Sequence, residues 1–336
     1  FTAAIIVGFL LTAVQTWTGV PSVKDWPLLA LVMLWLIGRI SLLFPGTIPN
    51  ALIVTVDLLF LPVAAACLAY PLIKVRLWRN LIFIPILLLM TFANATMHCA
   101  AALNSTTHQT LGSHTMVMLV TLVMCILGGR VFPMFTANGT QTSRVNPLRW
   151  LEIMSIVSVA FVLVFGTGWF ELPAVLVGAL FLIAGVANFV RALRWRIWVT
   201  FKTPLLWTLH LSYWAIAIGL ILLGLNQFGL MMHSSPGIHA LTIGGIGVMI
   251  LSMISRVSLG HTGRSLQVGP LMSIAFVCIS LAFVIRVFAP LLLDQYLQLI
   301  QVTALLWGLA YALFILVYLP ILTTEPVSYT HLRAHE

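Results

Sequence analysis

The sequence predicts an all-α membrane protein, a polytopic bundle of transmembrane helices. Of its 336 residues, 61% are hydrophobic and only 7% are charged, and the mean hydropathy is +1.12. Soluble domains carry a charge on about a quarter of their residues, so this composition excludes a soluble domain. The apolar runs have the length of roughly 20 residues that crosses a bilayer and show no strict alternation, which predicts spanning helices and not barrel strands.

Eleven apolar runs follow one another along the chain, and each is expected to form one helix. The first, residues 1–14, is too short to span a bilayer, lacks an initiating Met and begins without a helix cap. We therefore expect this chain to be truncated at its start. The other ten runs lie at roughly 27–44, 50–73, 80–103, 111–128, 149–168, 172–193, 204–224, 236–255, 268–287 and 292–320.

Basic residues fall in alternate loops between these runs. Thirteen of the 16 lie in loops expected on one side, and Arg39 and Arg286 lie on the other. Loops rich in Lys and Arg stay in the cytoplasm, so we expect the basic loops to be cytoplasmic. The net charge of +9 therefore indicates topology and gives no reason to expect nucleic acid as a partner.

We expect residues 1–322 to form a single transmembrane domain. Residues 323–336 are polar and rich in His, unlike the run before them, and we interpret them as a non-native tail. An authentic polar tail is the alternative. His331 and His335 are accordingly excluded from the candidate ligands, and the four cysteines, all inside apolar runs without CxxC spacing, are interpreted as small core residues.

The run that begins near His239 is predicted to be a central helix. Sixteen uncharged residues separate His239 from Arg256 and cover roughly 25 Å, most of a hydrocarbon core. Because Gly244, Gly245 and Gly247 have no side-chain bulk, a neighbouring helix is expected to approach this one closely.

A short internal repeat relates this helix to an earlier one. His114 precedes Arg130 by 16 residues, His239 precedes Arg256 by 17, and each Arg is followed by Val. The two Arg-Val pairs are 126 residues apart, which is four spans with their loops. This spacing predicts a three-fold repeat of four-helix units, twelve spans in all, of which about eleven are present.

Five histidines fall at or near the outer ends of the spans: His98, His108, His114, His233 and His239. Several imidazoles at one depth favour ligation of haem iron or copper, whereas hydrogen-bonded packing is the alternative for each one alone. His114 and His239 are the principal candidates because they occupy equivalent places in the repeat. His98 and His233 are second candidates, and His108 is expected to be solvated.

Other polar residues are weaker candidates for a site. His210 lies within an aromatic-rich span. One interpretation is that the aromatic neighbours only anchor the helix at the membrane interface. The other is that His210 binds a second cofactor or conducts protons. Arg256 and Arg264 flank His261 in a loop that is able to hold an anion or a haem propionate, although anchoring topology is an equal explanation. Asp57, deep in a span, is expected to accept a hydrogen bond between helices or to relay protons.

Three stretches resemble a known family: GGRVFPMFTANG at 128–139, PLLWTLHLSYWAIAIGL at 204–220 and HALTIGGIGVMILSMISRVSLGHTGRSL at 239–266. They are similar to the NnrS family of bacterial inner-membrane proteins associated with the response to nitric oxide, and the likeness extends to about Leu322. The resemblance implies twelve spans, bound haem and copper, and a His-containing segment before Phe1 that is absent here.

The resemblance, together with the histidines at the outer ends of the spans, therefore favours a haem- and copper-binding protein of the inner membrane that responds to nitric oxide or protects against it. Its expected partners are the lipid bilayer, nitric oxide and an unidentified electron donor. No Walker, GxSxG or HExxH motif is present, so hydrolytic and nucleotide-dependent chemistry lacks support, and haem-based redox chemistry stays open. The alternatives are a transporter of a metal or metal-nitrosyl species through a His- and Met-lined passage, and a membrane scaffold with structural histidines.

Overall fold

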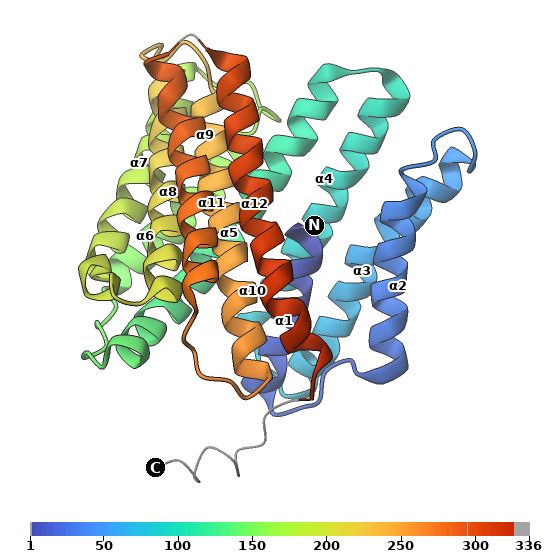
Figure 1. The fold of residues 1–336 in the computed structure, drawn as a ribbon. Coiled ribbons are helices and arrows are strands. Elements are labelled where there is room, and N and C mark those ends of the chain that lie inside the picture. Colours follow the sequence, from blue (N-terminus) through green and yellow to red (C-terminus); the bar gives the residue numbers. More distant parts are fainter. Residues whose placement is uncertain (1, 294, 326–336) are drawn as a thin grey trace. The chain divides into compact units, whose positions relative to one another are not determined.

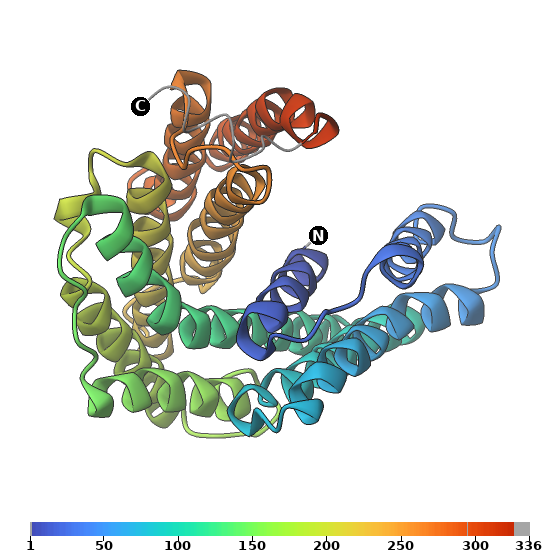
Figure 2. The ribbon, with the colours of Figure 1, turned by 90° about the horizontal axis from the view of Figure 1, so that it is seen from below.

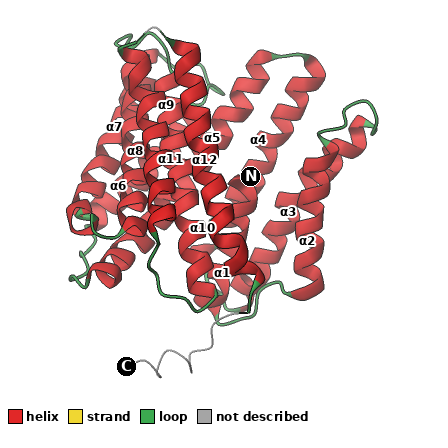
Figure 3. Ribbon diagram, in the orientation of Figure 1, coloured by secondary structure: helices red, strands yellow, loops and turns green. Residues whose placement is uncertain are grey.

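The computed structural model describes residues 2–293 and 295–325. In these ranges the chain forms helices joined by short loops and no strand (Figure 3). Eleven long helical segments occupy the eleven places predicted from the apolar runs. The all-α prediction is confirmed.

Eight of the described helical segments are long and apolar enough to cross a membrane. Three further helices, α1 (Thr2–Thr18), α2 (Asp25–Ser41) and α6 (Arg149–Phe165), have 17 residues each. At about 1.5 Å per residue they cover roughly 25 Å. The chain is therefore a multi-pass helical membrane protein, as predicted.

The described residues form two compact units. The N-terminal unit contains residues up to 123 together with 167–169, and the C-terminal unit contains 124–166 and the chain from 170 onward. The single domain expected over residues 1–322 stays a prediction. Most of the predicted polar tail, 326–336 with both of its histidines, lies outside the described residues.

The N-terminal unit is organised around α3 (Asn50–Lys74), which contacts α1, α2 and α4 (Phe83–Leu103). It also contains the first part of α5 (Thr106–Thr140). Helix α3 packs because small and branched side chains on one side of it are buried. These are Leu61, Ala64, Ala65 and Leu68.

The C-terminal unit is organised around α8 (Pro204–Gln227), whose side chains are buried along most of its length. It contacts α7 (Ala174–Arg194), α9 (Ser235–His239), α10 (Val248–His261) and α11 (Pro270–Phe288). Helix α12 (Tyr296–Thr323) packs against α10 and α11, and these three helices lie side by side in both views (Figures 1 and 2).

The segment from α9 to α10 is one continuous helix with an irregular middle, because Ala240–Gly247 form a π-helix. A β carbon added at Gly244 would lie 2.6 Å from Ala215 Cβ and would also meet Phe283. One added at Gly245 would lie 3.0 Å from Ile216 Cγ1. The predicted close approach at these glycines is confirmed, and the neighbours are α8 and α11.

Two helices extend further than the sequence predicted. Helix α5 was expected to end near residue 128, but it continues through Gly128 and Gly129 to Thr140. The two glycines are sites of close packing and not of chain reversal, which comes at Gln141 with a φ of 54°. Helix α10 likewise continues past Arg256 to His261.

Candidate functional site

A buried carboxylate in the N-terminal unit gathers polar side chains from three helices. Asp57 on α3 is 5% exposed, and Gly38 on α2 allows the two backbones to approach closely. Asn94 Nδ2 on α4 donates to Asp57 Oδ2 at 2.8 Å, and Arg39 on α2 forms an ion pair with Oδ1. The expected hydrogen bond between helices at Asp57 is confirmed.

His98 completes this cluster. Its Nε2 lies 2.9 Å from Asp57 Oδ2, so the ring donates from Nε2 to the carboxylate. No group in the described part of the chain bonds to its Nδ1, which is left with a lone pair. Imidazoles that bind metals usually donate their other N–H to a carboxylate, which fixes the ring and raises its basicity. His98 therefore has the environment of a metal-binding imidazole.

His114, on α5 of the same unit, is half-buried and has no hydrogen-bond partner among the described residues. A β carbon at Gly112 would meet Met97 of α4, so residue 112 faces α4. At about 100° per residue, His114 lies roughly 200° further round the helix and points away from α4. His98, four residues after Asn94, lies on the face of α4 that contacts α3. The two histidines therefore leave their helices in different directions.

His239, in the C-terminal unit, ends α9 and directly precedes the π-helix. Its Nε2 accepts a hydrogen bond of 2.9 Å from Arg286 Nη2 on α11. The same Nη2 donates to Tyr296 Oη at 3.2 Å. Since Arg286 engages the Nε2 lone pair, a metal would bind His239 through Nδ1 or after Arg286 turns away. His114 and His239 belong to different units, and their common ligation stays a prediction.

His210 is the most deeply buried histidine among the described residues, at 1% exposed. Its Nε2 lies 2.8 Å from Thr136 Oγ1 on α5, which ties α8 to α5. The rings of Phe132 and Trp195 surround it at centroid distances of 5.9 and 6.4 Å. Its Nδ1 is buried without a partner. The contacts support a structural bond, and a second cofactor or proton path at His210 stays a prediction.

A second buried polar cluster, not predicted from the sequence, lies in the C-terminal unit. Arg191, one of the thirteen basic residues assigned to loops from the sequence, lies within α7 and is 1% exposed. It forms an ion pair with Glu152 of α6, and its Nη1 donates to the Cys125 carbonyl at 2.8 Å and to Tyr213 Oη at 2.7 Å. One guanidinium therefore connects α5, α6, α7 and α8.

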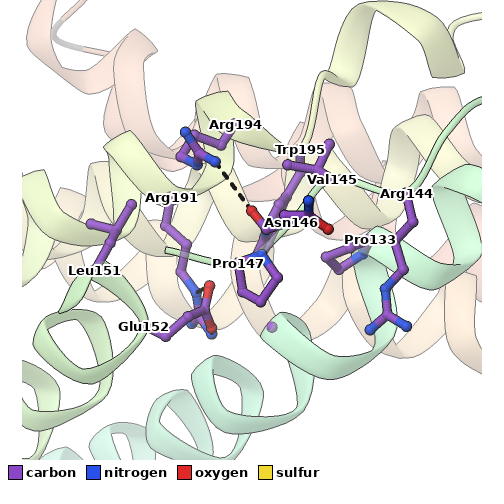
Figure 4. A pocket seen from close by; sticks show the side chains of 11 residues that line it. Pro133, Arg144, Val145, Asn146, Pro147, Leu151, Glu152, Arg191, Arg194 and Trp195 are labelled. Atoms are coloured by element: carbon purple, nitrogen blue, oxygen red, sulfur yellow. Dashed lines mark hydrogen bonds and ion pairs between the residues drawn. The ribbon is translucent and has the colours of Figure 1, made fainter. Parts of the chain in front are cut away.

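The cluster continues through Asn188, one turn before Arg191. Tyr213 Oη donates to Asn188 Oδ1 at 2.5 Å, and Asn188 Nδ2 donates to the Ser155 carbonyl at 3.1 Å. Figure 4 shows Arg191 and Glu152 head to head beside a small cavity of about 20 Å³. That volume is enough for one water molecule. The neighbouring loop is fixed by Arg194, which donates to the Asn146 carbonyl at 3.1 Å (Figure 4).

Two adjacent glycines make room for this cluster. A β carbon at Gly129 would collide with the Arg191 guanidinium, and one at Gly128 would lie 2.9 Å from Tyr213 Cε2. Part of this cluster could have been predicted from the sequence. Asn188 and Arg191 are three residues apart and share one face of an apolar helix, which indicates a polar site on that face. The partner Glu152 lies 39 residues away in sequence, and no spacing rule links it to Arg191.

The remaining candidates belong to neither cluster. His233 is exposed in the loop before α9, and His108 contacts Ser105 Oγ through Nδ1 at 2.8 Å. Arg264 donates to Thr324 Oγ1 at 3.1 Å, whereas Arg256 stacks on Phe135. The two arginines therefore have different surroundings, although they were expected to act together.

The donor groups fit haem better than a copper ion bound by several ligands. Among the described residues, no three His, Cys, Asp or Glu side chains lie close enough to hold one metal ion. A haem iron needs only one or two axial ligands from the protein. His98, oriented by Asp57 and with a free Nδ1, meets that requirement.

Comparison with known proteins gives one result that covers almost the whole chain. The NnrS protein family matches residues 1–325. No curated protein and no solved structure matches the chain. The matched range includes both buried clusters and the three stretches on which the resemblance rests, two of which supply Gly128, Gly129, His210 and Tyr213. The chain belongs to the NnrS family.

Proposed function

We propose that this chain is a haem-binding protein of the bacterial inner membrane that acts in the response to nitric oxide, with His98 as an axial ligand of the iron. The observation that supports the proposal is the 2.9 Å contact between His98 Nε2 and Asp57 Oδ2, which leaves Nδ1 free. Family membership supports the role in the nitric oxide response.

Each member of the N-terminal cluster has a part in this proposal. Asp57 fixes the ring orientation and holds the proton on Nε2, so that Nδ1 keeps its lone pair. Arg39 balances the charge of the Asp57 carboxylate through Oδ1. Asn94 donates to Oδ2, the oxygen that also accepts from His98, and so helps to fix its orientation. A ferrous haem held there would supply an iron that binds nitric oxide. The residues of this chain hold and orient the ring that binds the iron.

The other histidines are proposed as further ligands with different requirements. His114 has no partner to displace, whereas His239 has to lose its bond from Arg286 to use Nε2. Copper remains an expectation of the resemblance, and we assign it no ligand set because the described residues assemble none. The cytoplasmic position of the basic loops is likewise proposed from their charge alone.

The proposal is tested on the full chain, purified from a haem-supplied bacterial host. The haem-to-protein ratio and the optical spectrum are measured for the wild type, His98→Ala, Asp57→Asn and the control His108→Ala. We expect a Soret band that shifts with nitric oxide in the wild type and in the control. His98→Ala loses it, and Asp57→Asn lowers haem affinity about 10- to 100-fold.

Two results would contradict the proposal at different levels. Wild-type haem content in both His98→Ala and Asp57→Asn would remove His98 as a ligand and move the assignment to His114 or His239. A wild-type chain that takes up no haem would remove the cofactor altogether. Growth under nitric oxide of a strain lacking its NnrS protein, complemented with each variant, then shows whether haem content and protection change together.

A further inference from the structure

A cavity of the C-terminal unit lies where α8 begins. It has a volume of about 490 Å³. Four separate parts of the chain line it: the end of α5, the residues leading into α8, one residue of α10, and the segment before α11. The polar groups among them are Asn138, Lys202, Thr203, Arg256, Ser265 and Gln267.

The charge around this cavity is entirely positive. Lys202 and Arg256 line it, and no Asp or Glu does. Neither residue takes part in an ion pair within the described ranges. The Arg256 guanidinium lies 3.8 Å from the centroid of the Phe135 ring, a stacked position that fixes its plane beside the cavity. Two uncompensated cations therefore line one partly open cavity.

The backbone adds to this positive field. Helix α8 has 24 residues and begins at Pro204, so its N-terminal end borders the cavity. The preceding residue, Thr203, forms no side-chain cap. The Leu205 N–H, which has no backbone partner in the described ranges, and the positive end of the helix dipole favour an anion there. The hydroxyl of Ser265 and the amide of Gln267 are further hydrogen-bond donors on the wall.

The position of the cavity and the residues that line it indicate which class of ligand it fits. It lies at the ends of two membrane-spanning helices, the level at which phospholipid phosphates lie in a bilayer. Its remaining wall is apolar and includes Leu205, Leu206 and Val268. A free phosphate would leave most of the volume empty. We propose that this cavity binds a phosphate group carried on an apolar body, namely an anionic phospholipid headgroup.

The cavity is lined by Arg256 and Lys202, whereas the sequence suggested that Arg256 acts with Arg264. Arg256 lines the cavity, but Arg264 does not, because it bonds to Thr324 near the end of α12. Lys202, which precedes α8, takes its place. The site is independent of the haem proposal, because none of its residues belongs to the Asp57 cluster.

Lipid binding is measured by native mass spectrometry of the purified chain in a zwitterionic detergent, titrated with phosphatidylglycerol or with phosphatidylcholine of the same acyl chains. We expect the wild type to prefer phosphatidylglycerol, and added salt to weaken that preference. Lys202→Gln and Arg256→Gln each raise the Kd for phosphatidylglycerol about tenfold. Arg256→Lys keeps part of the affinity, and Lys74→Gln, an exposed charge outside the cavity, leaves it unchanged.

Further measurements distinguish a lipid headgroup from free phosphate and from a haem propionate at this cavity. Lys202 is exposed, so Lys202→Gln remains informative even if Arg256→Gln fails to fold. Inorganic phosphate that competes with phosphatidylglycerol at equal affinity would identify free phosphate as the source and support the same site. Equal phosphatidylglycerol binding by the wild type, Lys202→Gln and Arg256→Gln would overturn the proposal. So would variants that lose haem but keep the lipid, because the cations would then hold a haem propionate.

Discussion

Removing the charge of Glu152 is expected to destabilise the C-terminal unit severely. Arg191 is 1% exposed, and Glu152 supplies its counter-charge through Nε and Nη2. A guanidinium keeps its proton under all ordinary conditions, so Glu152→Gln leaves a buried cation whose hydrogen-bond partners are all neutral, namely the Gln amide oxygen, the Cys125 carbonyl and Tyr213. Losing one partner of a buried pair costs about 3–5 kcal/mol.

The expected rescue by a second substitution makes this prediction specific. Arg191→Met replaces the cation by an apolar chain of similar length, so the double variant Glu152→Gln with Arg191→Met contains no buried unpaired charge. Replacing a whole buried pair by apolar residues is often neutral or stabilising. We therefore expect the double variant to be more stable than Glu152→Gln alone, with a coupling energy of about 0.5–3 kcal/mol.

The assay is unfolding of the purified chain in mixed detergent micelles with increasing sodium dodecyl sulfate, followed by circular dichroism and tryptophan fluorescence. Glu171→Gln is the matched control, because Glu171 is exposed and forms no ion pair in the described ranges. The reasoning fails if Glu152→Gln unfolds like the control, or if the two single effects simply add in the double variant.

Two substitutions at glycines test close packing in the same assay. Gly129→Ala is expected to cost about 1–3 kcal/mol, because its β carbon meets the Arg191 guanidinium, whereas Gly8→Ala meets nothing within 4 Å and should be neutral or slightly stabilising. Gly244→Ala is expected to cost a similar amount by pressing on Phe283, with Gly308→Ala, which is also unobstructed, as its control. If a variant is as stable as its control, the neighbouring side chains can shift to make room for the β carbon, and the predicted cost at that glycine is wrong.

The helices were predictable because a membrane span needs a long apolar run, and length and composition can be read locally. All eleven described helical segments were found in this way. The end of α5 was not found, because Gly128, Gly129 and Arg130 read as a loop. In the structure, the glycines admit Arg191 and Tyr213, and the helix continues to Thr140.

Positions along a helix were easier to predict than directions around it. His98 lies near the end of α4 as predicted, but His114, expected to open its helix, lies eight residues after the start of α5 at Thr106. The sequence also did not show that the two histidines leave their helices on different faces. Asp57 was recognised as a buried acceptor, yet its partner Arg39 was counted only as a topological charge. Such pairing depends on which helices are neighbours, and that information is non-local.

The arrangement of Arg191 also changes how the family resemblance is understood. The stretch at 128–139 resembles the NnrS family, and its first two residues are required to be small because a guanidinium and a phenol ring occupy the adjacent space. A structural cluster therefore accounts for Gly128 and Gly129 without any cofactor. Haem binding is therefore proposed at the Asp57–His98 pair in the other unit, where a carboxylate holds an imidazole whose second nitrogen has no protein partner among the described residues.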